Sequence, residues 1–299
     1  MQLITEAQVA TVLDADTARL ALREAFLQHG RGRAQVLARH RATATQDGHA
    51  LAISAMGAIL DADGDLPAVL GTKVYSSRNG RYHFLVSLFS AATGAALATL
   101  EANEFTRLRT AAATAVATDL LALPDAKTLA VFGAGIQARA HAEALVRVRG
   151  FERVLVCARS GAEAFAAELG GESVDAATAA AEADVIVTAT RSATPLFDGG
   201  LVKPGAFVAA VGSSTRTARE LDDTLLARAA LIAVEWRTAA ELEAGDLVNC
   251  PPARWTELGE LLASPRLRGP RDIAVYKSVG IGLEDVALAR VVARRLGVL

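Results

Sequence analysis

Three cationic side chains are hard to explain as solvated charges. Lys73 lies in "PAVLGTKVY", Arg109 precedes the alanine-rich part of "TRLRTAAATAVA", and Arg41 lies in the strand-like "RHRATA". A surface position with a packed aliphatic stem would explain any one of them alone. Together they favour a pocket for a small anion, because arginine clamps a carboxylate with two hydrogen bonds and lysine can donate a proton beside it.

A glycine-containing turn in "LAVFGAGIQARAHAEAL" adds a second chemical signal. The apolar run 129–132 predicts a buried strand, and 137–145 predicts a helix with apolar residues at helical spacing. Gly133 permits a tight turn, Gly135 lets a ligand approach the backbone, and Ala138 stands where strand and helix pack closely. The unpaired N–H groups at such a helix start bind a dinucleotide pyrophosphate, although a strand-to-helix turn can also need glycine for steric reasons alone.

The end of the next strand indicates which dinucleotide fits. The sequence there is "LVCARSG", with Ala158, Arg159 and Ser160 in a row and no acid before Glu163. An NAD site carries Asp or Glu for the ribose hydroxyls at this place, whereas a guanidinium and a hydroxyl suit a 2′-phosphate. We therefore expect NADPH, with NADH as a weaker cofactor, unless Arg159 is simply a solvated surface charge.

The other chemistry-bearing residue types form no competing constellation. His83 falls in a strand-like run and His141 on the helix after the glycine turn, where packing or solvent contact is the expected role. Cys157 and Cys250 are far apart and lack the spacing of a zinc site or a disulfide framework. No Ser/His/Asp or paired-carboxylate pattern stands out, so we expect neither a hydrolase nor a bound metal.

Composition and charge exclude several classes of protein. Of 299 residues 52% are hydrophobic, and 31 Lys plus Arg stand against 33 Asp plus Glu, which leaves no basic surface for nucleic acid. The uncharged run 82–100 holds Ser, Thr and Gly in its middle, which predicts two strands and a turn rather than a membrane helix. The N-terminus has a capping pattern, Thr5 to Gln8, and no secretion signal, so we place the protein in the cytoplasm.

Strands and helices alternate from residue 127 onward, as they do in a doubly wound parallel sheet. The strand-like runs are "TLAVFG", "RVLVCA", "DVIVTAT", "AFVAAVGS" and "LIAVEW", with helical runs such as "GAEAFAAEL" and "ELDDTLLARA" between them. The sequence therefore predicts a Rossmann-type α/β domain, which binds the dinucleotide, over residues 113–276.

The first part of the chain has a different pattern. Residues 1–13 and the stretch up to about residue 30 predict helices, and five strand-like runs follow, connected by Gly and Asp turns. Residues 103–123 predict a connecting helix, and the amphipathic tail is expected to return to the first unit. Residues 1–112 plus 277–299 thus form the expected α+β domain.

The assembled motifs resemble those of the ornithine cyclodeaminase/mu-crystallin family. The resemblance runs over most of the chain and includes "GTKVYS", "TRLRTAAATAVAT", "VFGAGIQARAH", "ADVIVTATRSATPLF", "LVKPGAFVAAVGSSTRTARELDD" and "YKSVGIGLEDVALA". So many matches in one order are much more specific than the glycine turn alone. The resemblance implies an enzyme that acts on a small α-amino or α-imino acid, and a homodimer built through the first domain, which also binds the substrate.

The resemblance also implies roles for individual positions. Arg41, Lys73 and Arg109 would line the substrate pocket, with Lys73 and Arg109 as the catalytic residues. We further expect the pocket volume around Met56 and the loops near residues 76–81 to set substrate choice. The residues expected at the cofactor are Thr110, Gly133, Ala134, Gly135, Ile136, Gln137, Ala158, Arg159, Ser160, Thr190, Gly212, Ser213, Ser278, Val279 and Gly280.

One position departs from the cyclodeaminase pattern of this family. Cyclodeaminases carry an aspartate in the loop after the "VG" strand, and this chain has Ser214 there. Ser214 and Arg159 favour the ketimine-reducing branch, which includes bacterial Δ1-pyrroline-2-carboxylate reductases, although Ser213 and Ser214 could also serve to cap a helix. The alternatives are a cyclodeaminase-type lyase, an amino-acid dehydrogenase like alanine dehydrogenase, and a small-molecule binding protein like mu-crystallin.

The resulting hypothesis is the NADPH-dependent reduction of a cyclic imino acid to an amino acid. Δ1-Pyrroline-2-carboxylate would give L-proline, and its six-membered piperideine homologue would give L-pipecolate. Arg41 and Arg109 would fix the carboxylate, and Lys73 would protonate the ring nitrogen or keep it protonated through a water.

Overall fold

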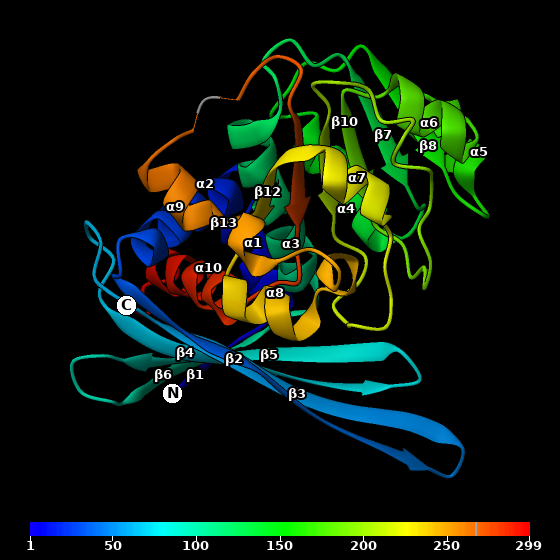
Figure 1. Ribbon diagram of the computed structural model, residues 1–299. Coiled ribbons are helices and arrows are strands. Elements are labelled where there is room, and N and C mark those ends of the chain that lie inside the picture. Colours follow the sequence, from blue (N-terminus) through cyan, green and yellow to red (C-terminus); the bar gives the residue numbers. More distant parts are fainter. Residues whose placement is uncertain (267) are drawn as a thin grey trace. The chain divides into compact units, whose positions relative to one another are not determined.

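The structure, a computed structural model, describes residues 1–266 and 268–299 and divides into two units (Figure 1). Unit 1 comprises Met1–Ala113 and Ile281–Leu299, and unit 2 comprises Thr114–Gly280. Helix α3 (Asn103–Leu121) carries the chain from the first unit into the second. It is rich in alanine and ends shortly before a proline, which cannot continue a helix.

A six-stranded sheet forms the frame of unit 1. Its strand order is β1-β6-β5-β4-β3-β2, and all neighbours are antiparallel except β1, which pairs parallel with β6. The strands are β1 (Gln2–Ile4), β2 (Ala34–Gln46), β3 (His49–Leu60), β4 (Val69–Arg78), β5 (Arg81–Ser90) and β6 (Ala96–Glu101). The other helices of the unit are α1 (Glu6–Val12), α2 (Ala15–Gly30) and α10 (Gly282–Arg295).

Alternation along the strands gives this sheet one covered and one exposed face. Lys73 on β4 pairs with Met56 on β3 and Val86 on β5, and all three side chains are buried. Val74 and Leu85, which point to the other face, are 39% and 47% exposed. Helix α10 contacts β2, β3, β4 and β5 and covers the face that carries Lys73.

Glycine lets α10 begin directly against the sheet. A Cβ on Gly282 would lie 2.3 Å from the backbone nitrogen of Gly57 on β3, a distance that no side chain tolerates. The start of the helix is therefore held at backbone distance from the sheet. This approach brings Glu284 and Asp285, in the first turn of α10, over the covered face.

The N-terminal segment corrects one prediction. Residues 1–13 read as helix, yet Gln2–Ile4 form strand β1. Thr5 then caps α1 by the expected reciprocal hydrogen bonds with Gln8. A strand of three residues has no periodicity of its own, and it forms because its backbone pairs with β6.

Unit 2 is built on an eight-stranded parallel sheet with the order β13-β12-β14-β11-β10-β7-β8-β9. The strands are β7 (Thr128–Phe132), β8 (Arg153–Cys157), β9 (Glu172–Ser173), β10 (Val185–Thr188), β11 (Phe207–Ala210), β12 (Ala229–Val234), β13 (Trp255–Glu257) and β14 (Ile273–Lys277). The helices are α4 (Ile136–Leu145), α5 (Ala162–Glu168), α6 (Ala176–Glu182), α7 (Asp223–Arg228), α8 (Arg237–Glu243) and α9 (Leu258–Ala263), with short 3₁₀ turns η1 (Gly245–Leu247) and η2 (Pro252–Arg254).

The strand order places a topological switch beside β7. The chain continues from β7 to β8 and β9 on one side, and then crosses to β10 on the other side. Strands β7, β10, β11 and β14 are buried along their whole length, as parallel strands covered on both faces should be. Ligands of such sheets bind at the carboxyl ends of the strands next to the switch.

The predicted fold class, a Rossmann-type doubly wound parallel sheet with an α+β unit, is confirmed. Strand β14, the last strand of unit 2 in the chain, lies between β12 and β11 and is not among the predicted strands. The uncharged run 82–100 forms parts of β5 and β6 and the turn between them. Among the residues that the structure describes, no helix combines the length and the apolar character needed to cross a bilayer.

Candidate active site

Lys73 is a buried cation in the middle of β4, with 1% of its side chain exposed. Its Nζ donates a hydrogen bond of 2.9 Å to Oδ1 of Asp285 on α10. The same nitrogen lies 5.2 Å from the centroid of the Phe84 ring and 5.7 Å from that of Tyr75. One carboxylate and two aromatic rings thus surround the ammonium group.

The surroundings of Lys73 bring its ionisation close to neutral pH. Burial lowers the pKa of this amine most, the nearby Arg109 charge lowers it further, and Asp285 raises it. The net effect lowers the pKa of Lys73 from 10.5 to about 7. A group with this pKa can hold a proton and release it near neutral pH, as a general acid must.

Arg109 on α3 meets the same pair of carboxylates. Its NH1 donates a hydrogen bond of 2.7 Å to Oε2 of Glu284, and its Nε lies 3.5 Å from Oδ1 of Asp285. The other Glu284 oxygen accepts the backbone N–H of Ile281 at 3.0 Å, which fixes the start of α10. Lys73, Arg109, Glu284 and Asp285 form one buried group of two positive and two negative side chains, which we call the charge cluster.

The charge cluster is expensive to bury and is therefore a candidate functional site. Removing an ion from water costs several kcal/mol even after the protein relaxes, and apolar side chains of similar volume often pack at lower cost. Asp285 Oδ2 has no hydrogen-bond partner among residues 1–266 and 268–299. The cluster thus keeps an acceptor that a further donor can use.

Arg41 and Met56 lie on the same face of the sheet as Lys73. The Arg41 guanidinium donates hydrogen bonds to the Ser54 hydroxyl at 3.1 Å and to the Tyr75 hydroxyl at 3.2 Å. Tyr75 in turn flanks the Lys73 ammonium. Met56 is 1% exposed and pairs with Lys73 in the strand register. The structure therefore brings the predicted substrate residues of the strands onto one face, next to Arg109.

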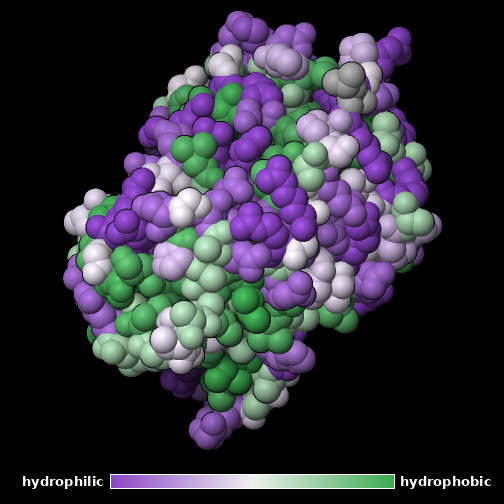
Figure 2. All heavy atoms as spheres, turned by 90° about the vertical axis from the view of Figure 1, so that its left-hand side faces the viewer, coloured by the Kyte–Doolittle hydropathy of each residue, from purple (hydrophilic) through white to green (hydrophobic). Residues whose placement is uncertain are grey.

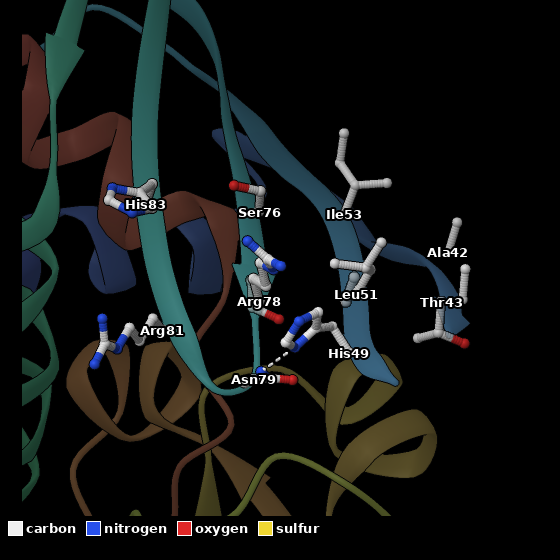
Figure 3. A pocket seen from close by; sticks show the side chains of 13 residues that line it. Ala42, Thr43, His49, Leu51, Ile53, Ser76, Arg78, Asn79, Arg81 and His83 are labelled. Carbon is white, nitrogen blue, oxygen red and sulfur yellow. Dashed lines mark hydrogen bonds between the residues drawn. The ribbon is translucent and has the colours of Figure 1, made fainter. Parts of the chain in front are cut away.

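Residues 76–81 form a hairpin and not the loops that the sequence analysis expects. Strand β4 runs to Arg78, β5 begins at Arg81, and Asn79 and Gly80 make a two-residue turn with φ of 50° and 75°. This hairpin and that of β2 and β3 line a cavity of about 930 Å³ (Figure 3). No residue of the charge cluster lines this cavity.

The glycine turn opens α4 at the carboxyl end of β7. Gly133 has a φ of 113°, and a Cβ there would lie 2.8 Å from the carbonyl oxygen of Ala189, so this position needs glycine. A Cβ on Gly135 would meet no atom within 4 Å, so the space beside that residue is open to a ligand. Within the described residues no side chain caps α4, whose first N–H groups suit a pyrophosphate. Ala134 lies in the turn, and Ile136 and Gln137 are the first residues of α4.

The end of β8 offers the predicted guanidinium beside this turn. Ala158, Arg159 and Ser160 directly follow β8, which pairs with β7, and Arg159 and Ser160 are exposed. In the part of the chain that the structure describes, the Arg159 side chain makes no hydrogen bond or ion pair. Its charge is therefore available to an anionic group at this end of the sheet. These residues, with Gly133 and Gly135, fit a nicotinamide dinucleotide, and the preference for NADPH stays a prediction.

Glu220 is a fully buried carboxylate that ties together the ends of β10 and β11. Its Oε1 accepts the backbone N–H and the hydroxyl of Thr190, both at 2.7 Å. Its Oε2 accepts the backbone N–H of Gly212 and the hydroxyl of Thr188, both at 2.8 Å. Glu220 thereby fixes two of the residues that the sequence analysis assigns to the cofactor.

A second buried ion pair holds the residue after Gly212. Lys277 Nζ lies 2.8 Å from Oδ2 of Asp246 and donates to the backbone carbonyl of Ser213, also at 2.8 Å. Asp246 Oδ1 accepts the backbone N–H groups of Glu220 and Leu221. The loop after β11 is thus fixed from both sides by buried charges.

Glu235, at the end of β12, fixes the predicted cofactor residues after β14. Its Oε1 accepts the hydroxyl of Ser278 at 2.5 Å and the backbone N–H of Gly280 at 3.2 Å. Its Oε2 accepts the backbone N–H of Val279, also at 3.2 Å.

Thr110, the remaining predicted cofactor residue, lies on α3 in unit 1. Its hydroxyl donates to the carbonyl of Thr106, and its contact with the cofactor stays a prediction.

The buried acids that position the predicted residues are not among the residues predicted from the sequence. Glu284 and Asp285 stand at a helix start, where acids usually serve the helix dipole, so they attract no attention. The available signal is their apolar context, since "VGIGLEDVALA" holds two adjacent acids in an apolar run. The same signal marks Glu235 in "LIAVEW", because a carboxylate in a buried strand needs a specific partner.

His141 is a buried residue of α4. Its Nδ1 lies 2.7 Å from the carbonyl oxygen of Gln137 and its Nε2 lies 3.0 Å from the Thr114 hydroxyl. Burial lowers the pKa of His141 from 6.5 to about 4, although the Gln137 carbonyl opposes this change. The side chain is therefore neutral near pH 7 and serves packing, not catalysis.

We expect His141 to make folding less stable in acid. The unfolded chain protonates this side chain below its ordinary pKa of 6.5, and the folded chain does so only near 4. Stability is therefore lost as the pH falls from 6.5 to 4, by on the order of 3 kcal/mol for this residue. Urea unfolding of the parent and of His141→Gln across this range measures the effect. An equal pH slope in both proteins would contradict the assignment.

Known proteins of similar sequence match most of this chain. The model of the ornithine cyclodeaminase/mu-crystallin family matches residues 1–297. The ketimine reductase mu-crystallin of Mus musculus is 38% identical over an alignment of 214 residues that covers 69% of this chain and 67% of that protein.

Solved structures match nearly the whole chain. A "probable ornithine cyclodeaminase" from Bordetella pertussis Tohama I has 40% identity and a TM-score of 0.92, over 99% of this chain and 97% of that chain. The Δ1-pyrroline-2-carboxylate reductase of Thermococcus litoralis, in complex with NADH and L-proline, has 28% identity and a TM-score of 0.88, over 99% and 98%. The chain described here belongs to the ornithine cyclodeaminase/mu-crystallin family.

Proposed function

We propose that this protein is an imine reductase that uses NADPH to reduce a cyclic imino acid, Δ1-pyrroline-2-carboxylate or Δ1-piperideine-2-carboxylate, to L-proline or L-pipecolate. The observation that carries the proposal is the buried Lys73, held between a carboxylate and aromatic rings with Arg109 beside it. The names of the ketimine reductase and the pyrroline-carboxylate reductase among its relatives support imine reduction.

Each side chain of the site has a distinct role in this reaction. Arg109, with Arg41 on the same face, holds the substrate carboxylate by charge-assisted hydrogen bonds and so fixes the position of the imine carbon. Lys73 donates a proton to the ring nitrogen or keeps it protonated, because the iminium accepts hydride far better than the imine does. The bound nicotinamide cofactor supplies the hydride for the imine carbon. Imine, hydride and proton together give the cyclic amine.

A panel of substrates tests this function. NADPH absorbance is followed with each of the two cyclic imino acids, with pyruvate plus ammonia, and with ornithine. We expect rapid NADPH loss with one or both imino acids and little with pyruvate plus ammonia. Loss with pyruvate plus ammonia alone would instead identify an alanine-dehydrogenase-like enzyme. Binding without turnover would identify a binding protein.

A cyclodeaminase is the second candidate, because the Bordetella structure carries that name at 40% identity. A cyclodeaminase releases ammonia from ornithine without net consumption of the cofactor. Ser214 argues against cyclodeaminase activity, because a serine side chain has no carboxylate to interact with the substrate amine. Ammonia release from ornithine in the same panel would overturn the reductase proposal.

Arg159 is the residue that we expect to select NADPH over NADH. Its side chain is exposed at the end of β8 and has no acidic partner in the described residues, so it can pair with a 2′-phosphate. Arg159→Asp should raise the KM for NADPH by roughly 10- to 100-fold and lower that for NADH, because a carboxylate repels the phosphate and accepts ribose hydroxyls. Kinetics with both cofactors measure the change.

An arginine at the start of β8 provides the control for Arg159, which follows the end of that strand. Arg153 lies at the other end of β8 and pairs with Glu172 and Glu182. Arg153→Gln should leave the cofactor preference unchanged, whereas Arg159→Gln should reduce it. If the preference for NADPH survives in Arg159→Asp, the cofactor assignment is wrong.

We infer that the exposed face of the sheet in unit 1 joins two copies of the chain. Ile53, Val74 and Leu85 on this face are 56%, 39% and 47% exposed. Figure 2 shows hydrophobic side chains gathered in its lower half, where Figure 1 has the strands β1 to β6. Monomers rarely expose apolar patches of this kind. Ile53 also lines the cavity of Figure 3, so the side chains that line this cavity would then contact the second copy.

Charges on this face should separate the two copies. Ile53→Glu combined with Leu85→Lys places hydrated side chains where apolar surface is buried in the dimer, so light scattering should report a monomer. Leu242→Glu is the control, because Leu242 lies on α8 in unit 2 and is 54% exposed. A parent protein that is already monomeric, or an unchanged dimer in the double variant, would contradict the inference.

With small molecules and its own copies as partners, we place the protein in the cytoplasm.

A further inference from the structure

Among residues 1–266 and 268–299, the Lys73 ammonium has one anionic hydrogen-bond partner, Asp285. The two residues are separated by 212 positions in the sequence, and their 2.9 Å contact is buried on both sides. Without a second element to hold it, a lysine side chain with four rotatable bonds would have no fixed direction. The contact with Asp285 therefore decides where the ammonium lies.

We infer that Asp285 is a positioning residue, which aims Lys73 at the substrate nitrogen and keeps it protonated, while Glu284 aims Arg109 at the substrate carboxylate. This inference rests on the proposed function. Neither carboxylate needs to touch the substrate for this role. Both belong to the first turn of α10, so one rigid element orients the acid and the clamp together.

The groups that face Lys73 define what Asp285 must oppose. Arg109 from α3 and Arg39 from β2 act against the charge of the ammonium, and burial acts in the same direction. Strand β3 contributes the apolar Met56, and β5 contributes Phe84 and Val86. Tyr75 lies on the strand of Lys73 itself. Glu284, the neighbour of Asp285 on α10, pairs with Arg109. Among these groups Asp285 is the anion in direct contact with Lys73, so removal of its charge leaves the ammonium without a contacting anion.

The sign of the expected change follows from this balance. Asp285→Asn keeps the size of the side chain and removes the negative charge, so the protonated form of Lys73 becomes less favourable and its pKa falls further. Because the protonated amine is the acid, activity at alkaline pH falls first. We expect the alkaline limb of the kcat profile to move to lower pH by roughly one to three pH units.

A direct titration measures this effect without substrate. The chain has four lysines, Lys73, Lys127, Lys203 and Lys277, so ¹³C-labelled lysine gives few side-chain signals in an NMR spectrum. Lys73→Met identifies the Lys73 signal. In the parent protein that signal should titrate close to neutral pH, well below the signal of the exposed Lys127. In Asp285→Asn its midpoint should fall.

Two further variants separate positioning from a general loss of structure. Asp285→Glu keeps a carboxylate but displaces it, so the Lys73 midpoint and the kcat profile should lie between those of the parent and Asp285→Asn. This variant also decides the question if Asp285→Asn does not fold. Glu284→Gln removes the negative charge that pairs with Arg109 and leaves one acceptor oxygen for two donors, so it should raise the substrate KM with a smaller change in the Lys73 midpoint.

Asp65→Asn is the matched control for these substitutions. Asp65 forms an ion pair at the surface with Arg294, which lies on α10 as Asp285 does. The Asp65 side chain is 76% exposed. This variant should keep the parent profile and the parent Lys73 titration.

Unchanged Lys73 midpoints in both Asp285 variants, or an unmoved alkaline limb, would overturn the inference. The NMR result also stands apart from the proposed function. If no imine is reduced but the Lys73 midpoint still moves, then the proposed reaction falls and the positioning of Lys73 by Asp285 remains.

Discussion

Lys73→Met is expected to lower kcat for imine reduction on the order of 10²- to 10⁴-fold, with a much smaller effect on the KM for the substrate. Methionine replaces the aliphatic part of the side chain, one atom shorter than lysine, and has no proton to donate. The Lys73 ammonium lies among Asp285, Phe84 and Tyr75, with 1% of the side chain exposed, so bulk water does not easily replace it. Single-turnover reduction, followed by NADPH absorbance, measures the chemical step.

The control for this substitution is a lysine outside the site. Lys127 is 55% exposed and pairs with Glu152, so Lys127→Met should turn over like the parent. Circular dichroism of Lys73→Met checks that the protein folds after one cation of the charge cluster is removed. If a folded Lys73→Met reduces the imine at the parent rate, Lys73 is not the acid.

Arg109→Lys should reduce kcat/KM for the imino acid by roughly 30- to 1,000-fold, because the loss of one partner in a buried charged hydrogen bond costs about 2 to 4 kcal/mol. The substitution keeps the positive charge that Glu284 and Asp285 require, but a lysine lacks the planar fork that binds a carboxylate in a bidentate manner. Steady-state kinetics and the inhibition constant of the product amino acid report the loss.

An uncharged substrate shows whether the lost energy belongs to the carboxylate. With Δ1-pyrroline, which lacks that group, the parent and Arg109→Lys should differ little. Arg107→Lys is the control on the same helix, since Arg107 pairs with Glu104 outside the charge cluster. An equal loss with both substrates would mean that Arg109 serves the fold and not the carboxylate.

Local patterns in the sequence were sufficient to predict most of the framework that carries the site. The alternation of apolar runs predicts the doubly wound sheet, and the glycine turn is located correctly because a φ of 113° at Gly133 leaves no other residue type. Lys73 and Arg109 stand out because their neighbours in the sequence are apolar. Such signals depend only on residues close along the chain.

The partners of these residues could not be predicted in the same way. Asp285 meets Lys73 across 212 positions, and the contact depends on the close approach of Gly282 to Gly57. Neither the period of a helix nor that of a strand encodes such an approach. Strand β1 escapes detection for a related reason, since only its pairing with β6 makes it a strand. Long-range packing therefore decides what local patterns leave open.

Transfer of an isotope tests the central claim most directly, namely that Lys73 and Arg109 hold an imino acid for reduction. The protein is given NADPH that carries deuterium at C4 of the nicotinamide, on the face that is transferred, together with Δ1-pyrroline-2-carboxylate or its six-membered homologue. The account predicts one deuterium at the α-carbon of the L-amino acid formed. At matched reaction times, Lys73→Met and Arg109→Lys should form far less of this labelled product. A product without deuterium, or undiminished labelling in both variants, would contradict it.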